Sequence, residues 1–215
     1  MKRIFGRVEF VFDLLYLSSA SIMGLIMFLR SNQDTRMLIA AFMTMVLVFG
    51  DMFHLIPRMK IIINQNKISD TKSLGIGKQV TSITMSLFYL LFWYLGIILF
   101  EIDNILLSIV IIVLTIIRIV FCLVPQNQWT IKNPPLKWSI IRNIPFVLQG
   151  LMVTILFYIY RNSFLNLKNL YLAVIISFVF YIPVVLWANK KPAIGMLMLP
   201  KTLAYIWIII LLMNL

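Results

Sequence analysis

Apolar residues in this chain gather in seven runs of roughly twenty residues, separated by short polar segments. The runs cover residues 8–29, 37–56, 80–100, 104–124, 143–160, 170–188 and 193–214. About twenty apolar residues in an α-helix are enough to cross the roughly 30 Å hydrocarbon core of a bilayer. The pattern predicts an all-α integral membrane protein, a seven-transmembrane-helix bundle in which residues 1–215 form a single polytopic transmembrane domain.

The overall composition agrees with this pattern. Hydrophobic residues make up 62% of the 215 residues and charged residues 12%, and the mean hydropathy is +1.00. An ordinary soluble domain is about 45–50% apolar and about 25% charged. A soluble domain of this length could not bury so much apolar surface, so the composition excludes that class.

The net charge of +12 is distributed unevenly between the two sides of the predicted bundle. Most of the 19 Lys and Arg residues lie in the N-terminus and in the second, fourth and sixth connections. The positive-inside rule then predicts a cytoplasmic N-terminus and an outside C-terminus, in a multi-pass protein of the cell membrane. This placement favours contact with anionic membrane lipids and argues against a nucleic-acid partner. The oligomeric state stays open.

The second apolar run ends with ionisable residues inside the string GDMFHLIPR, at positions 50–58. Asp51 and His54, the only histidine of the chain, stand one helical turn apart in it. Ionisable residues inside a membrane are costly and usually mark a functional site. An aspartate three residues before a histidine can orient the imidazole for proton transfer near neutral pH. Asp51 and His54 are the candidate catalytic residues.

Further polar residues fall at a similar depth on the cytoplasmic half of other predicted spans. They are Asp13, Arg118, Gln149 and Lys201, which we interpret as candidate substrate-binding residues. Depth alone suggests that Asp51 pairs with Arg118 and that Asp13 pairs with Lys201, since opposite charges offset each other's desolvation. The alternative is that these residues only hold helices together near the interface. The sequence favours a water-filled pocket that opens to the cytoplasm.

Other segments are less informative. Residues 57–79 form the longest predicted connection, in which Gly75 and Gly77 mark a flexible entry into the third span. Cys122 is the only cysteine, so no intrachain disulfide is possible. One histidine and few carboxylates make a poor ligand set, and the sequence predicts no metal and no cofactor.

The string beginning Gly50-Asp51, with Leu55 and Pro57-Arg58, resembles a mark of the YhhN family of membrane lysoplasmalogenases. In that family, a similar segment precedes a glycine-containing entry into an aromatic-rich span, as residues 75–77 precede FYLLFW at 88–93 here. The resemblance implies a bundle that hydrolyses the vinyl-ether bond of lysoplasmalogens near the inner leaflet, and this chain would match the last seven of the family's eight spans. Residues 182–183 are Ile-Pro where the family has Ser-Asp, so only Asp51 carries over.

Three functions follow from these observations. The first is a lipid or amphiphile hydrolase of lysoplasmalogenase-like type, in which Asp51 and His54 handle protons while Arg118 and Lys201 hold an anionic headgroup. The second is a permease for a small solute or ion that uses the same residues as a relay. The third is a non-catalytic lipid-binding membrane subunit. The outer halves of the spans offer few polar residues, which favours the enzyme over the permease.

Overall fold

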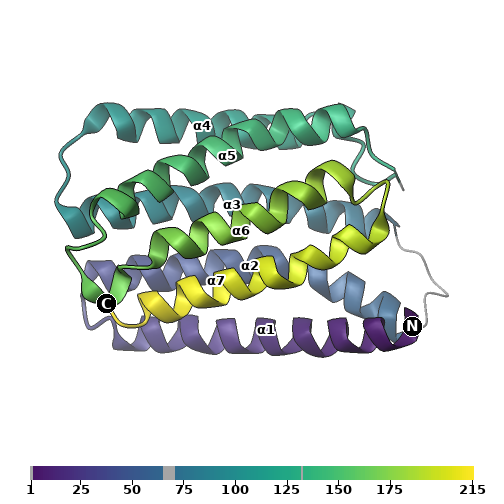
Figure 1. Ribbon diagram of the computed structural model, residues 1–215, viewed down its shortest axis with the longest axis horizontal. Helices are drawn as coiled ribbons and strands as arrows, with labels where there is room; N and C mark the ends of the chain where they lie inside the picture. The colour runs from purple at the N-terminus through teal and green to yellow at the C-terminus, as the bar shows by residue number, and fades with distance from the viewer. Residues whose placement is uncertain (1, 65–70, 132) are drawn as a thin grey trace.

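The computed structural model describes residues 2–64, 71–131 and 133–215, and the described chain is helical without strands (Figure 1). The long helices are α1 (Lys2–Arg30), α2 (Thr35–Ile63), α3 (Thr71–Phe100), α4 (Ile105–Leu123), α5 (Leu136–Ile159), α6 (Leu170–Trp187) and α7 (Met198–Leu212). Short 3₁₀ helices η1 (Pro125–Asn127), η2 (Leu165–Leu167) and η3 (Pro192–Leu197) precede α5, α6 and α7. Seven helical segments in this described part are long and apolar enough to cross a membrane.

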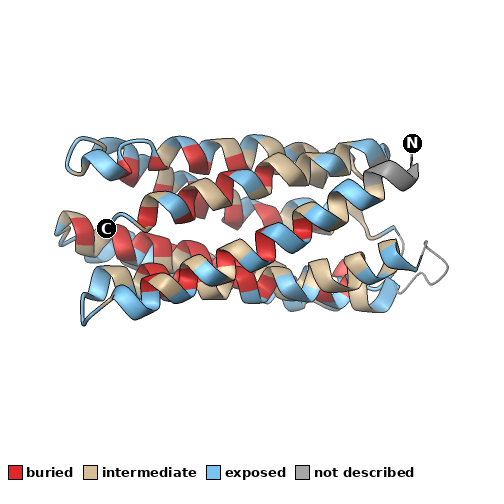
Figure 2. Cartoon of the chain, turned by 90° about the horizontal axis from the view of Figure 1, so that it is seen from below, coloured by how far each residue is buried: buried red, intermediate tan, exposed pale blue. Residues whose placement is uncertain are grey.

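The helices run roughly along one axis, and consecutive helices pack side by side (Figure 1). Contacts between α1 and α7 close the ring, and α3 also packs against α5. The termini lie at opposite ends of the bundle (Figure 1). We call the end where α1, α3 and α5 begin the amino-side end, and the other the carboxyl-side end. Buried residues form stripes on the inward faces of the helices, with exposed residues outside (Figure 2).

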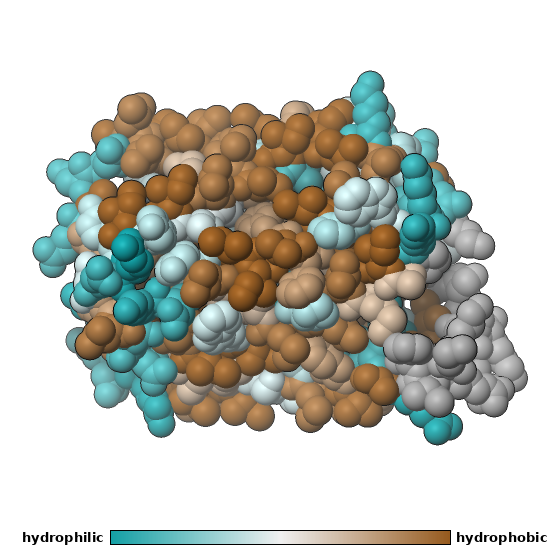
Figure 3. Space-filling model, viewed as in Figure 1, coloured by the Kyte–Doolittle hydropathy of each residue, from teal (hydrophilic) through white to brown (hydrophobic). Residues whose placement is uncertain are grey.

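The outer surface is apolar over the middle of the bundle and polar at both ends (Figure 3). Helix α4 shows this most clearly, because Ile105, Leu106, Ile116 and Val120 are all exposed large hydrophobic residues. A soluble monomer rarely exposes contiguous apolar patches beyond a few hundred Å². The predicted all-α fold with seven span-length helices is therefore confirmed, and the surface is that expected of a polytopic membrane protein.

The helix boundaries correct the prediction of a long connection over residues 57–79. Helix α2 continues to Ile63 and α3 already begins at Thr71, so residues 57–63 and 71–79 are helical; residues 65–70 lie outside the described chain. Gly75 and Gly77 are not a flexible entry. A Cβ at Gly77 would overlap the Phe53 carbonyl oxygen, and one at Gly75 would overlap the Trp129 carbonyl oxygen. These glycines permit close backbone approach.

The chain contains three Ile-Pro pairs, at positions 56–57, 144–145 and 182–183. The prolines of all three pairs lie inside helices. Pro57, Pro145 and Pro183 belong to α2, α5 and α6, so none of them ends its helix. Neighbouring helices can satisfy the backbone groups that proline leaves free, and prolines are therefore tolerated in membrane helices. As a result, the helices extend beyond the apolar runs, and α5 begins at Leu136 rather than at residue 143.

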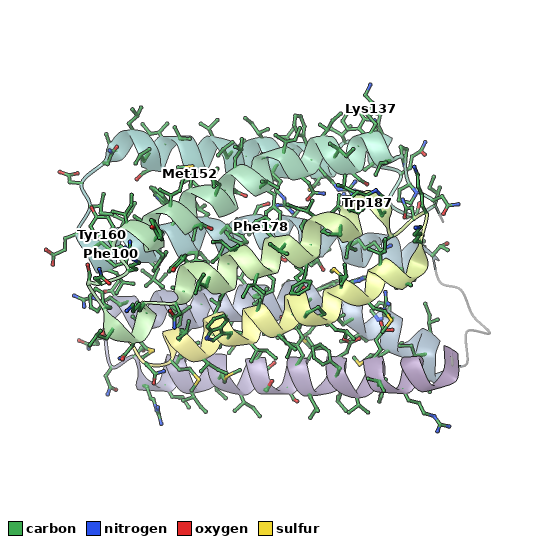
Figure 4. The ribbon with its side chains drawn as sticks, viewed as in Figure 1. Phe100, Lys137, Met152, Tyr160, Phe178 and Trp187 are labelled. Atoms are coloured by element: carbon green, nitrogen blue, oxygen red, sulfur yellow. The ribbon has the colours of Figure 1, made fainter. Side chains whose placement is uncertain are left out.

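Aromatic side chains fill the centre of the bundle and its carboxyl-side half. Phe88, Tyr89, Phe92 and Phe157 are all buried, and the Phe92 and Phe157 rings lie 5.0 Å apart. Near the carboxyl-side end, Phe100 stacks on Tyr160 with ring centroids 4.7 Å apart (Figure 4). This packing closes the carboxyl-side half, while the amino-side half holds the polar side chains described below.

The start of α2 offers a test of the local structure. The Asp34 side chain caps this helix by accepting a hydrogen bond of 2.9 Å from the Arg36 amide. Replacing an aspartate cap by alanine costs about 0.5–2 kcal/mol, so Asp34→Ala should lower the free energy of unfolding by about that amount. Urea unfolding in maltoside micelles measures the difference. Asp103→Ala, in an exposed turn at the same end, is the control, and an equal loss in both variants would contradict the cap.

Candidate functional site

The candidate catalytic residue Asp51 lies on α2 in the amino-side half of the bundle. The Tyr16 hydroxyl of α1 donates a hydrogen bond of 2.7 Å to Asp51 Oδ2. Lys201 of α7, a helix that packs against α2, lines the same cavity as Asp51. Thr81 of α3 donates to the carbonyl oxygen of the preceding residue, Gly50, at 2.7 Å. Three neighbouring helices thus fix this segment of α2.

The two predicted ion pairs do not form. The guanidinium of Arg118 lies on the Phe146 ring, 3.4 Å from its centroid, and Lys201, rather than Arg118, lines the same cavity as Asp51. The reason is the order of helices around the bundle. Helix α2 packs against α1, α3 and α7, whereas α4, which carries Arg118, packs against α3 and α5. Helix α3 therefore separates Asp51 from Arg118.

Asp13 lies on α1 next to a charged pair at the amino-side end. It is 4% exposed, and its Oδ2 atom has no hydrogen-bond partner in the described chain. Arg58 and Glu9 form an ion pair close by, and both exert charge interactions on Asp13. Among the described residues, Asp13 forms no ion pair with Lys201, although both side chains line the same cavity.

His54 occupies the turn of α2 after Asp51 and is half-buried. Its Nδ1 atom has no hydrogen-bond partner among the described residues, and the hydrogen bond that Asp51 accepts comes from Tyr16. The expectation that Asp51 orients the imidazole is therefore wrong for this conformation. His54 instead forms part of the wall between two cavities.

The first cavity, which we call the carboxylate cavity, has a volume of about 200 Å³ and lies between α1, α2, α7 and η3. Three acidic residues line it: Glu9, Asp13 and Asp51. Arg58 and Lys201 line the same cavity. The cavity therefore offers carboxylates and cations together, as general acid–base chemistry requires.

The second cavity, which we call the basic cavity, has a volume of about 250 Å³ and extends towards α4, α5 and α6. Its basic lining residues are Arg58, Lys78, Arg118, Arg142 and Lys201. The residues that line both cavities are His54, Arg58, Thr81, Gly195, Met198 and Lys201. The two cavities are therefore neighbours, and their shared wall contains the cations Arg58 and Lys201.

Gln149 differs from the other predicted binding residues because it lines neither cavity. Its side chain is fully buried and donates a hydrogen bond of 2.6 Å from Nε2 to Thr115 Oγ1 of α4. The Gln149 Oε1 atom has no partner in the described chain. In this conformation the residue links α4 to α5.

Sequence reasoning missed Tyr16, Lys78 and Arg142. Tyr16 is three residues after Asp13, on the same face of α1, and this helical spacing could have found it. Lys78 and Arg142 were assigned to connections because the apolar runs were taken as the full length of the helices. The structure places both on extended helix ends that line the basic cavity.

Metal ligands are not grouped in the part of the chain that the structure describes. Although Glu9, Asp13, Asp51 and His54 line one cavity, no three His, Cys, Asp or Glu side chains of the described residues are arranged so that they could hold a metal ion. Comparisons with protein-family models, curated proteins and solved structures give no match. The class therefore rests on the fold and the site alone: a helical bundle of the polytopic membrane type, with two adjoining cavities that contain charged lining residues at its amino-side end.

The Tyr16–Asp51 contact offers a test of this geometry. Tyr16→Phe removes the hydroxyl donor and leaves Asp51 Oδ2 without this partner in a half-buried position. Hydrogen bonds to charged groups contribute about 1.5–3 kcal/mol, so the free energy of unfolding should fall by about that amount. Urea unfolding in maltoside micelles measures the loss. Tyr94→Phe, at an exposed position of α3, should change little, and a Tyr16 variant as stable as wild type would argue against the contact.

Proposed function

We propose that this chain is a polytopic membrane hydrolase that acts on a single-chain amphiphile, in the manner that its resemblance to the lysoplasmalogenases implies. The supporting observation is the position of Asp51. Its carboxylate accepts a hydrogen bond from Tyr16, interacts with Lys201, and lines a polar cavity that adjoins a strongly basic one. Membrane lipids surround the bundle and supply the substrate.

In the proposed function, the protein lies in the cell membrane with the amino-side end of the bundle facing the cytoplasm. The basic residues of the N-terminus and of the second, fourth and sixth connections support this orientation through the positive-inside rule. Both cavities lie near this end, so an amphiphile of the inner leaflet could enter with its headgroup towards the cytoplasm and its chain towards the bilayer.

Hydrolysis adds one water molecule across the bond that breaks, so it needs a group that gives a proton and a group that takes one. Asp51 and His54 are the pair that supplies these roles, since both line the carboxylate cavity. In vinyl-ether cleavage, the acid protonates the vinyl carbon that does not carry the ether oxygen, and water adds to the resulting oxocarbenium ion while the base takes a proton from the water. The hemiacetal formed then breaks its C–O bond to the alkoxy group, whose oxygen leaves with the proton of the hemiacetal hydroxyl. The products are an aldehyde and an alcohol. Lys201, beside Asp51, and Arg118 hold the negatively charged part of the substrate.

The enzyme is favoured over the permease by the aromatic core. Transport would require a polar route to the carboxyl-side end, and the buried rings of Phe88, Phe92 and Phe157 occupy that part of the bundle. A non-catalytic lipid-binding subunit would use the same cavities without turnover. An activity assay therefore distinguishes this third function from the hydrolase.

The test is an assay of the purified protein in maltoside micelles. The substrates are single-chain phospholipids that share one headgroup and differ in a vinyl-ether, ester or alkyl-ether linkage, and mass spectrometry follows the products. We expect hydrolysis of the vinyl ether or the ester, with the alkyl ether untouched. Absence of turnover across the whole panel would contradict the proposal. Solute counterflow in proteoliposomes would favour the permease instead.

A further inference from the structure

The basic cavity collects cationic side chains from five helices. Arg58 comes from α2, Lys78 from α3, Arg118 from α4, Arg142 from α5 and Lys201 from α7. No Asp or Glu is among the described residues that line it. Like charges close together in a medium of low dielectric constant repel each other strongly. The cavity is therefore built to receive negative charge.

Two of these five cations also face carboxylates of the neighbouring cavity. Arg58 forms the ion pair with Glu9, and Lys201 interacts with Asp51. Across residues 2–64, 71–131 and 133–215, no carboxylate forms an ion pair with Lys78, Arg118 or Arg142. These three side chains carry the positive charge that the protein itself leaves uncompensated in the basic cavity.

Arg118 is the most buried of the three, with 1% of its surface exposed. Its Nε and Nη1 atoms have no hydrogen-bond partner in the described chain. A guanidinium presents its donors in a planar fork that matches two oxygens of a phosphate or a carboxylate. A buried arginine with free donors is costly unless a ligand accepts from it.

The aromatic rings of the cavity are already covered by cations of the protein. Arg142 lies 4.0 Å from the centroid of the Trp129 ring, and Arg118 lies 3.4 Å from that of Phe146. Lys201 lies 5.1 Å from the centroid of Tyr181. Sites for choline-like ammonium groups use open aromatic faces or carboxylates. Neither is offered by the described lining of this cavity.

We propose that the basic cavity binds a terminal phosphate group with no attached ammonium, such as the phosphate monoester of an anionic amphiphile. A phosphate dianion supplies the charge and the acceptor oxygens that Lys78, Arg118 and Arg142 lack. The inference deepens the proposed function and rests on it in taking this phosphate as the headgroup of the substrate. The phosphate chemistry itself is measured by binding, without turnover.

The experiment compares three probes on the purified protein in maltoside micelles by titration calorimetry. Octyl phosphate and octyl phosphocholine share a chain and differ in the ammonium group, and inorganic phosphate has no chain. We expect octyl phosphate to bind at least about tenfold more tightly than octyl phosphocholine, a difference of about 1.4 kcal/mol. Equal affinities for the two octyl compounds would overturn the proposal.

Two variants test the cavity lining at residues less buried than Arg118, so that loss of the fold does not explain a loss of binding. Lys78→Gln changes an exposed residue at the cavity wall, and Arg142→Gln changes one that also donates a 2.8 Å hydrogen bond to Asn127. Lys137→Gln is the matched control, because Lys137 stands on the same helix end as Arg142 but projects away from the bundle (Figure 4). Each cavity variant should lose most of the preference for octyl phosphate, and the control should keep it. An equal loss in the control would also overturn the proposal.

The phosphate group that binds could belong to a free phosphate ion or to a lipid headgroup, and the affinity for inorganic phosphate distinguishes the two. If it binds as tightly as octyl phosphate, the ligand is a free phosphate; if it binds much more weakly, the ligand is a lipid headgroup. Both results support a phosphate site. The two proposals fail separately: binding with this preference but without turnover contradicts the hydrolase alone, and turnover without the preference contradicts the phosphate site alone.

Discussion

Asp51→Asn is expected to reduce hydrolysis by about 10²–10⁴-fold while the bundle stays folded. The asparagine has nearly the same shape, and its amide oxygen can still accept the hydrogen bond from Tyr16. The substitution removes the negative charge opposite Lys201 and the ability to give or take a proton. The loss should appear in the turnover number, measured by mass spectrometry on the substrate that wild type cleaves best.

The control is Asp103→Asn, in an exposed turn at the carboxyl-side end of the bundle. It removes the same charge far from both cavities, so its turnover should equal that of wild type. Unfolding in urea should be followed in parallel, to show that the Asp51 variant retains its fold. A folded Asp51→Asn protein with wild-type turnover would remove Asp51 from the chemistry.

Gly77→Ala is expected to destabilise the bundle, although alanine is normally the better helix former. In an ordinary helix interior this change stabilises by about 0.5–1 kcal/mol. Here the new Cβ would overlap the Phe53 carbonyl oxygen and come 2.8 Å from His54 Cα, both backbone atoms of α2. Backbone atoms cannot rotate away as a side chain can, so α2 and α3 must separate. Overpacking of this kind costs about 1–3 kcal/mol, measured as a lower midpoint of urea unfolding.

The same change at Gly195 is the matched control. A Cβ at Gly195 meets no atom within 4 Å, so Gly195→Ala should leave the unfolding midpoint unchanged or raise it. The pair separates a steric effect from a general effect of alanine. A Gly77→Ala protein more stable than wild type would show that the close approach of α2 and α3 is not required.

The number and order of the helices could be predicted from the sequence, because each crossing needs its own apolar run. The ends of α2, α3 and α5 could not. Their final turns carry Arg58, Lys78 and Arg142, whose long stems can lie along apolar surface while the charge reaches a polar region. Because these charged residues lower the local hydropathy, the sequence pattern assigns such turns to connections. The predicted connection over residues 57–79 is wrong for this reason.

The candidate site was predicted in part. The depth of Asp13, Asp51 and Lys201 along their helices follows from the sequence, and the structure brings all three to the carboxylate cavity. Their partners could not be predicted, because depth is one coordinate and the order of helices around the bundle is another. Since α7 packs against α1 and α2, Lys201 lines the same cavity as Asp51, while Arg118 on α4 lines only the basic cavity.

The central claim is that a polar cavity opens to water at the amino-side, cytoplasmic end. Its most direct test is thiol labelling in vesicles. After Cys122, the only cysteine, is replaced by alanine, a new cysteine is introduced at Ser82, which lines the basic cavity, or one turn deeper at Ser86, which is buried. A membrane-impermeant maleimide is then added to inverted vesicles or to right-side-out cells.

If the cavity opens to the cytoplasm, Ser82→Cys is labelled in inverted vesicles and not in right-side-out cells, and Ser86→Cys is labelled in neither. Octyl phosphate should slow the labelling at position 82. If Ser82→Cys were labelled only from outside, or resisted labelling on both sides while reacting after denaturation, the cytoplasm-facing cavity would be contradicted.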